Sequence, residues 1–274
     1  MDTRQLAIGV FDSGMGGLTV LKAMRSLLPN ESFIYLGDTA RLPYGTKSPE
    51  TVKQYAIQMA RILVERRIKA LVIACNTATT AALPHLQAML PDIPVIGVVA
   101  PGAMAAVQAT ASQRIAVLAT ETTIASEAYQ KLILQHLPQA QISPKACSVL
   151  VALAEEGMVD NAVAKEALKH YLKGIGDVDT IVLGCTHFPV FRKTLADMLE
   201  RHVAIVDSAE ATARVLEELL QARDELNTLS GGKPSVHYLV TDSIQRFRTV
   251  GALFLGHALD VHDVELVEVK PTHP

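Results

Sequence analysis

Two similar segments of the sequence carry a cysteine at the same place. Each is an apolar, strand-like run that ends in a small residue, followed by a cysteine and two side chains able to form hydrogen bonds: residues 71–77 read LVIACNT, and residues 181–187 read IVLGCTH. The thiols, Cys75 and Cys185, stand 110 positions apart. A duplicated α/β unit would place them across a cleft, where one thiol could remove a proton from a carbon and the other could return a proton to its opposite face. The pair therefore indicates inversion of a carbon centre.

The alternative is that each cysteine is a buried small hydrophobe, as free cysteines often are. The polar residues that follow both Cys75 and Cys185 favour acid–base chemistry instead. Cys147 lacks this flank and is predicted to be structural. With three cysteines and no CxxC pair, the chain offers neither a disulfide framework nor a structural zinc site. We expect no metal.

Residues 12–17, which read DSGMGG, follow the first strand-like run. They resemble a dinucleotide-binding fingerprint only weakly, because Thr19 occupies the place of the third glycine. Asp12 and Ser13 are expected to point into the cleft, with the glycines letting the backbone approach a ligand. The alternative for Asp12 is a helix cap.

Two further features have both a structural and a functional interpretation. Residues 38–45, DTARLPYG, form either an ordered Ω-type turn or a wall whose backbone amides and Tyr44 contact a ligand. His187 follows Cys185 by two positions. It is either a structural histidine or a residue that polarises or protonates the Cys185 thiol.

Short apolar runs alternate with helical patterns along the chain, which predicts parallel α/β sheets. Strands are expected at residues 6–11, 33–36, 70–74, 95–98, 114–119, 142–147, 180–183, 204–206 and 236–240; helices are expected at 18–28, 48–67, 124–136, 161–173, 190–201, 209–222 and 243–254. Residues 230–234 are expected to form a flexible surface loop. In such sheets ligands bind beyond the carboxyl ends of the strands, where both candidate cysteines lie.

The composition excludes several classes of function. The chain has 274 residues, a net charge of −3 and no basic run, which argues against a nucleic-acid binder. Its most apolar stretch, residues 93–109, is interrupted by two prolines and two glycines and is not predicted to cross a membrane. The polar start shows no signal-peptide core, so a cytoplasmic protein is expected. The motifs contain no P-loop lysine and no candidate Schiff-base lysine, so we expect no cofactor.

Four motifs together resemble the glutamate racemases, which belong to the cofactor-independent aspartate/glutamate racemases. They are VFDSGMGGL at residues 10–18, DTARLPYG at 38–45, CNTA at 75–78 and GCTHFP at 184–189. The similarity covers nearly the whole chain. Departures from the family pattern occur at Ala100, where the family often has Glu, at Thr122, where Gly or Ala is common, and in residues 147–152.

The resemblance implies two similar parallel-sheet α/β domains related by a pseudo-twofold axis, with the active site between them. One domain would comprise residues 1–98 plus 208–274, and the other residues 99–207. The implied activity is cofactor-independent interconversion of L- and D-glutamate, which supplies D-glutamate for peptidoglycan synthesis and so serves cell wall biogenesis and cell shape. Glutamate is the expected small-molecule partner. The resemblance leaves open whether the protein forms a homodimer and whether a cell-wall precursor acts as its allosteric activator.

The resemblance also assigns residues. Cys75 would take the proton from D-glutamate and Cys185 from L-glutamate, with Asp12 assisting the first, His187 assisting the second, and Glu155 nearby. The implied substrate-binding residues are Asp12, Ser13, Pro43, Tyr44, Gly45, Asn76, Thr77, Thr120, Thr123, Thr186 and His187. A racemase for another substrate, such as aspartate or hydantoin, and a non-catalytic amino-acid sensor are the rival hypotheses.

Overall fold

The computed structural model describes residues 2–200, 202–227 and 234–269. Its strands are β1 (Ala7–Asp12), β2 (Phe33–Gly37), β3 (Ile68–Ile73), β4 (Val95–Gly97), β5 (Arg114–Ala119), β6 (Gln141–Ala146), β7 (Thr180–Gly184), β8 (Ala204–Asp207), β9 (Val236–Val240) and β10 (Val264–Leu266). Its α-helices are α1 (Leu18–Leu27), α2 (Pro49–Glu65), α3 (Asn76–Met89), α4 (Val99–Ala109), α5 (Glu121–Ala125), α6 (Ala128–His136), α7 (Val149–Glu155), α8 (Ala162–Leu172), α9 (Arg192–Met198), α10 (Ala209–Ala222) and α11 (Ile244–Leu255). Short 3₁₀ helices are η1 (Thr3–Gln5), η2 (Tyr44–Thr46), η3 (Phe188–Phe191) and η4 (Val261–Asp263).

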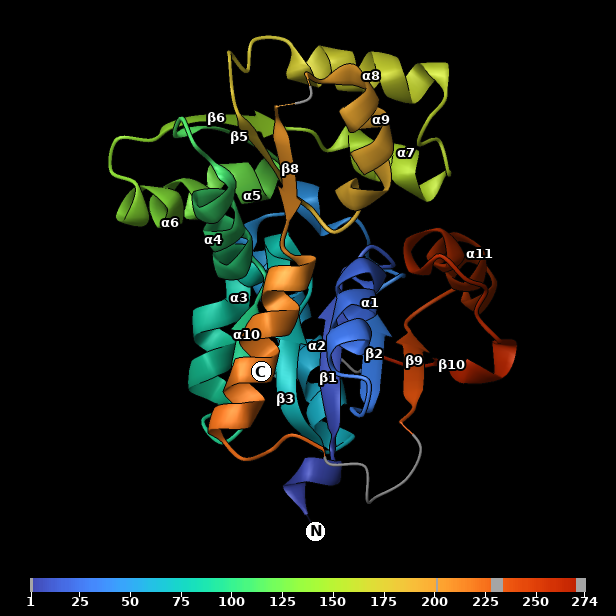
Figure 1. Cartoon of the computed structure of the whole chain (residues 1–274). Coiled ribbons are helices and arrows are strands. Elements are labelled where there is room, and N and C mark those ends of the chain that lie inside the picture. The colour runs from blue at the N-terminus through green and yellow to red at the C-terminus, as the bar shows by residue number, and fades with distance from the viewer. Residues whose placement is uncertain (1, 201, 228–233, 270–274) are drawn as a thin grey trace.

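The strands form two separate parallel sheets, one in each of two α/β domains (Figure 1). The first sheet has the order β10-β9-β2-β1-β3-β4, and the second has the order β6-β5-β7-β8. The predicted fold class is therefore confirmed. The strand order makes the first sheet discontinuous in sequence, because β9 and β10 follow all strands of the second sheet. The exact domain boundaries expected above stay a prediction.

Helices cover both faces of each sheet, because the side chains of a strand alternate between the two faces. In β2, Phe33 and Tyr35 pack with α1, α10 and α11, whereas Ile34 and Leu36 pack on the other face with α2 and α3. The second sheet packs in the same way between α4 and α6 on one face and α7, α8 and α9 on the other.

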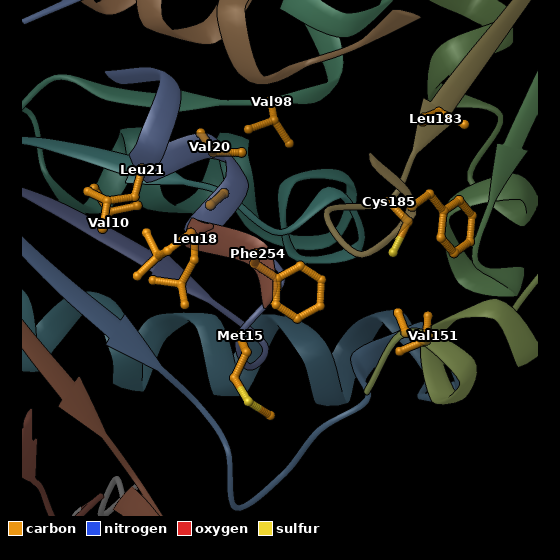
Figure 2. Packing of buried hydrophobic residues seen from close by; sticks show 14 of the residues in the cluster. Val10, Met15, Leu18, Val20, Leu21, Val98, Val151, Leu183, Cys185 and Phe254 are labelled. Atoms are coloured by element: carbon orange, nitrogen blue, oxygen red, sulfur yellow. The ribbon is translucent and has the colours of Figure 1, made fainter. Parts of the chain in front are cut away.

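The hydrophobic core is continuous between the domains. One cluster contains Met15 and Phe254 of the first domain together with Val151 and Cys185 of the second. Figure 2 displays these side chains around the loops that join the sheets to their helices. The carboxyl ends of the two sheets thus meet across packed side chains, and the loops at those ends are held by this core.

The structure adds elements that the sequence patterns did not predict: α3, α4, α7 and β10. It also divides the predicted helix 124–136 into α5 and α6, because Glu127 adopts a left-handed conformation with φ of 56°. The predicted helix 190–201 is shorter, since α9 ends at Met198 and a 3₁₀ turn precedes it. The last residue of the predicted helix 190–201 and residues 230–233 of the predicted surface loop lie outside the described residues. No helix in the described part of the chain has the length and apolar character needed to cross a membrane.

Candidate active site

Cys75 lies at the junction of a strand and a helix. β3 ends at Ile73, and Cys75 is the N-cap of α3, where its Sγ accepts a hydrogen bond from the backbone N–H of Ala78 at 3.4 Å. The N-terminus of a helix carries partial positive charge, which stabilises a negative sulfur. The thiol is 5% exposed. This placement depends on α3, which the sequence analysis missed.

Cys185 occupies the corresponding place in the second sheet. It follows Gly184, the last residue of β7, and is 7% exposed. Its Sγ lies 4.0 Å from Nδ1 of His187, and Nε2 of His187 lies 2.9 Å from Oε1 of Glu155. Sulfur, imidazole and carboxylate therefore form a buried row, with Glu155 supplied by α7.

A narrow cavity separates the two cysteines and is lined by both. Its lining residues are Ser13, Pro43, Tyr44, Gly45, Cys75, Asn76, Thr77, Thr120, Val151, Cys185, Thr186 and His187. Residues from the ends of both sheets thus surround one small space. The structure brings most of the predicted site residues together there.

Three predicted site residues do not line the cavity but are hydrogen-bonded to residues that do. Thr186 Oγ1 donates to Asp12 Oδ1 at 3.3 Å, and Glu155 contacts His187 as described. Thr123 Oγ1 shares hydrogen bonds with the hydroxyls of Thr77 and Thr120 at 3.1 and 3.0 Å. These residues lie behind the cavity wall and hold its side chains in place.

Asp12 stabilises the start of a helix, as one of its two alternatives suggests, and it lies behind the cavity wall. Its Oδ2 accepts hydrogen bonds from the N–H groups of Gly14 and Gly17, and Gly17 is the N-cap of α1. Its Oδ1 faces the hydroxyl of Thr186 in the other domain. The carboxylate therefore stabilises the turn that begins α1 and also connects the two halves of the site.

Gly16, one of the glycines after Asp12, is needed for packing between the two domains. A Cβ on Gly16 would lie 2.4 Å from Nδ1 of His187 and 2.6 Å from Oγ1 of Thr186. Gly16 is absent from the residues that line the cavity. Its missing side chain lets the loop of Cys185 pack against the start of α1; the expected approach of a ligand to these glycines stays a prediction.

The loop at residues 38–45 forms one wall of the cavity through Pro43, Tyr44 and Gly45. The Tyr44 hydroxyl donates to Asp38 Oδ2, which also accepts from Arg41 Nε at 2.7 Å. This network holds the buried side chain of Tyr44 in the wall of the cavity. The loop is therefore both an ordered turn and a wall of the cavity.

This wall is attached to the second domain. Thr122 Oγ1 in α5 donates to the carbonyl oxygens of Gly45 and Lys47 at 3.0 and 2.9 Å. A Cβ on Gly45 would lie 2.5 Å from Cβ of Thr120, so a glycine is needed for this approach. Thr122, one of the departures from the family pattern, thus joins the two sides of the cavity.

The two thiols have different electrostatic surroundings. Burial and then the charge of Asp12 raise the pKa of Cys75 to about 12, against hydrogen bonds from Ala78 and Ser13 that lower it. Burial by itself lowers the pKa of His187, but its interactions with Cys185 and Glu155 outweigh burial and raise that pKa to about 10. At neutral pH the site therefore presents a protonated Cys75 on one side and an imidazolium beside Cys185 on the other.

Asp12 is affected by the same burial. Desolvation raises the pKa of Asp12, whereas the charge of His187 and the N–H groups of Gly17 and Gly14 lower it. Two groups from different domains therefore influence each other's protonation across the site.

The sequence analysis missed two residues near the chemistry. Val151 of α7 lines the cavity, and Tyr129 of α6 hydrogen-bonds to Asn76. Both come from segments in which no motif stands out, and only spatial contact identifies them. Cys147 is fully buried in the core and does not line the cavity. Among residues 2–200, 202–227 and 234–269, no group of three His, Cys, Asp or Glu side chains is arranged to hold a metal ion.

Comparison with known proteins identifies the family. Residues 8–216 match the family described as Asp/Glu/Hydantoin racemase. A glutamate racemase of Geobacter metallireducens is 49% identical over 267 residues, which cover 96% of this chain and 98% of that protein. The chain belongs to the Asp/Glu/hydantoin racemase family. It is therefore an isomerase of the racemase class.

Solved structures of racemases agree with this assignment. Glutamate racemase from Francisella tularensis, crystallised with D-glutamate, has a TM-score of 0.89 and 36% identity, covering 97% of this chain and 98% of that chain. Glutamate racemase from Escherichia coli, crystallised with L-glutamate and the activator UDP-MurNAc-Ala, has a TM-score of 0.80 and 29% identity, covering 97% of this chain and all of that chain. The racemase fold thus extends over nearly the whole length of the protein.

Proposed function

We propose that this protein interconverts L- and D-glutamate without a cofactor, with Cys75 and Cys185 as its two acid–base residues. The observation that carries this proposal is the buried cavity with one thiol from each domain in its wall. The high identity to a glutamate racemase over nearly the full length supports glutamate as the substrate.

The proposed reaction needs two proton transfers on opposite faces of the α-carbon. With L-glutamate, the Cys185 thiolate takes the α-proton, and Cys75 gives its own proton to the other face. With D-glutamate the roles are exchanged, so each turnover moves one proton from substrate to one sulfur and one from the other sulfur to product. A Cys75 pKa of about 12 keeps that thiol protonated and ready to donate at neutral pH.

His187 and Asp12 assist the two sides unequally in this proposal. The imidazolium of His187, 4.0 Å from Cys185, stabilises negative sulfur, and Glu155 keeps that imidazole protonated. The charge of Asp12 opposes loss of the Cys75 proton, so the Cys75 thiolate is a strong base once it has formed. General acid–base assistance of this kind typically contributes about 10²–10⁴-fold to the rate.

The walls of the cavity supply neutral donors for the substrate carboxylates. We assign substrate binding to the hydroxyls of Thr77, Thr120 and Thr186, the amide of Asn76, and the segment of Ser13 and residues 43–45. Donors that bind more strongly as charge moves onto the carboxylate oxygens stabilise the transition state selectively. The closed, buried cavity strengthens each such hydrogen bond because it excludes water.

The biological role that we propose is the supply of D-glutamate for peptidoglycan. The Escherichia coli relative was crystallised with UDP-MurNAc-Ala as activator, so the same compound is the natural candidate for regulation of this protein. Adding it to the assay described next decides whether this chain responds. An increase in rate would support regulation by a cell-wall precursor, and an unchanged rate would exclude it for this compound.

The test is racemisation of purified, dialysed, metal-free protein followed by circular dichroism. We expect the signal of L-glutamate to decay to zero, and that of D-glutamate to do the same. In D₂O, deuterium should enter the α-position with either enantiomer. If L-aspartate racemises while L-glutamate keeps its signal, the substrate assignment is wrong; if glutamate binds without exchange, the protein is a sensor and not a racemase.

A further inference from the structure

The side chain of Asn76 has one polar atom engaged and one free. Asn76 begins α3, is 3% exposed and lines the cavity. Its Oδ1 accepts a hydrogen bond of 2.7 Å from the hydroxyl of Tyr129, whereas its buried Nδ2 has no hydrogen-bond partner among the described residues. A buried donor without a partner is costly, so an occupant of the cavity is its natural acceptor.

Tyr129 reaches Asn76 from the other domain. It lies in α6, is 1% exposed, and packs in a space made by two glycines. A Cβ on Gly102 would lie 2.7 Å from the Tyr129 hydroxyl, and a Cβ on Gly184 would lie 3.0 Å from its ring carbon Cε2. Gly184 directly precedes Cys185, so the ring of Tyr129 packs against the strand end from which Cys185 follows.

The hydroxyl of Tyr129 decides which way the amide of Asn76 faces. Burial, together with the charges of Asp207 and Cys185, raises the pKa of Tyr129 well above its ordinary value, so it keeps its proton and can donate. A donor at this position selects the carbonyl oxygen of the amide and directs the NH₂ group away. With the opposite orientation, Oδ1 would face the cavity and repel a carboxylate.

We infer that Tyr129 is a positioning residue that acts through Asn76 and orients its amide so that Nδ2 donates to a carboxylate of the substrate. The inference rests on the proposed function for the identity of that substrate. It gives a role to a tyrosine that touches neither thiol and lies in no motif of the sequence. The inference also means that the hydrogen bond from Asn76 of the first domain to the ligand depends on Tyr129 of the second domain.

The test measures binding of equilibrated DL-glutamate by calorimetry, since the equilibrium mixture shows no net turnover. Tyr129→Phe removes only the hydroxyl and should raise the dissociation constant about tenfold, the usual effect of one buried hydrogen bond. Asn76→Ala should weaken binding at least as much. Tyr238→Phe is the matched control, because Tyr238 is also a buried tyrosine but packs against Tyr35 and Phe247 instead of bonding to Asn76, and the dissociation constant of this variant should stay at the wild-type value.

The double variant separates positioning from a general structural role. If Tyr129 acts through Asn76, adding Tyr129→Phe to Asn76→Ala should cause no further loss of affinity. Multiplication of the two single effects would overturn the inference, as would wild-type affinity in Tyr129→Phe. Should Tyr129→Phe fail to fold, Asn76→Asp provides the second test. It keeps an acceptor for Tyr129 but turns a negative oxygen toward the cavity, so binding should fall more than a hundredfold; retained affinity would contradict the proposed orientation.

Failure of this inference is distinguishable from failure of the proposed function. Wild-type protein that neither binds nor racemises glutamate contradicts the proposed function. Wild-type protein that racemises glutamate, combined with a Tyr129→Phe variant of unchanged affinity, contradicts only the role of Tyr129.

Discussion

The residues around the two thiols differ more than the two similar segments suggest. Cys75 caps a helix and lies near the carboxylate of Asp12, whereas Cys185 lies beside the imidazole of His187. One side of the site thus favours a neutral thiol, and the other places a cation beside the sulfur. The neighbours of the two cysteines therefore favour a protonated thiol at Cys75 and a negatively charged sulfur at Cys185.

Replacement of either cavity thiol by a hydroxyl tests the two-base scheme. Cys75→Ser and Cys185→Ser should each lower racemisation by orders of magnitude, because a serine hydroxyl is far less acidic than a thiol. Circular dichroism with both enantiomers measures the loss. Cys147→Ser, which changes a buried thiol outside the cavity, should retain activity. Near-wild-type racemisation by Cys185→Ser would show that the scheme is wrong.

The Glu155–His187 contact predicts a specific pH dependence of stability. The pKa of His187 is raised from 6.5 to about 10 in the folded protein, so its stabilising contribution is fully present below pH 6.5 and is lost as the pH rises toward 10. Over that range the free energy of unfolding should fall by about 1.4 kcal/mol per pH unit from this group. Glu155→Gln lowers the pKa of His187 and shortens the range.

Urea unfolding from pH 6 to pH 10 measures this effect. The difference in stability between wild type and Glu155→Gln should be largest near pH 6 and shrink toward pH 10. Glu156→Gln is the control, because Glu156 is exposed and contacts Arg246 instead of His187. Equal pH profiles for wild type and Glu155→Gln would mean that Glu155 does not hold the proton on His187.

At the scale of elements, the strands other than β10 are predictable from the sequence, and several helices are not. Strands such as β1 and β3 are short apolar runs bounded by polar residues, and their ends place Asp12 and Cys75 at one edge of the sheet. By contrast, α4 is apolar apart from Gln108, even at its exposed residues Ala100 and Ala109, so it shows no clear amphipathic stripe. α3 is rich in Ala and Thr and contains Pro84, which also hides its pattern.

The candidate site was predictable for a related reason. Cys75 and Cys185 follow strand ends, where chain order indicates proximity to a ligand, whereas most of the other lining residues were predicted from the family resemblance. Tyr129 and Val151 lie inside helices, and their contacts with the site join residues far apart in sequence. No periodicity carries such information.

The contact between α5 and η2 predicts an effect on substrate affinity. Thr122→Val removes a hydroxyl that donates to the carbonyls of Gly45 and Lys47 but keeps the shape of the side chain. The wall formed by residues 43–45 should then be held less firmly, and KM for glutamate should rise about three- to tenfold. Thr249→Val, which removes an exposed hydroxyl within α11, is the control and should leave KM unchanged. Wild-type KM in Thr122→Val would show that this contact does not hold the wall for substrate binding.

At the scale of the whole molecule, a buried ion pair joins distant parts of the chain. Nζ of Lys69 lies 2.6 Å from Oε2 of Glu31, with both side chains at most 2% exposed. The same ammonium donates to the carbonyl oxygens of Arg4 and Glu225 at 2.8 Å. Lys69 lies near the start of β3, whereas Cys75 follows its end. The pair therefore stabilises the end of the first domain that lies opposite the active site.

Loss of this pair should affect stability and not catalysis. Lys69→Met leaves the carboxylate of Glu31 buried without a counter-ion, which typically costs about 3–5 kcal/mol. Arg66→Met is the matched control, because it breaks an exposed pair with Glu265 that is worth at most about 1 kcal/mol. Urea unfolding and racemisation at low temperature measure the two properties. Equal destabilisation by the two variants would contradict this account, as would a large loss of kcat in folded Lys69→Met.

The position of β9 has a consequence for how the protein is made. β2 pairs with β9 from Phe33–Val236 to Gly37–Val240, so the edge of β2 stays open during synthesis of all the strands of the second sheet. An open, apolar edge can pair with another chain. On the ribosome, the second sheet can form while the first still lacks its last strands, and the apolar edge of β2 is covered only once β9 has been made.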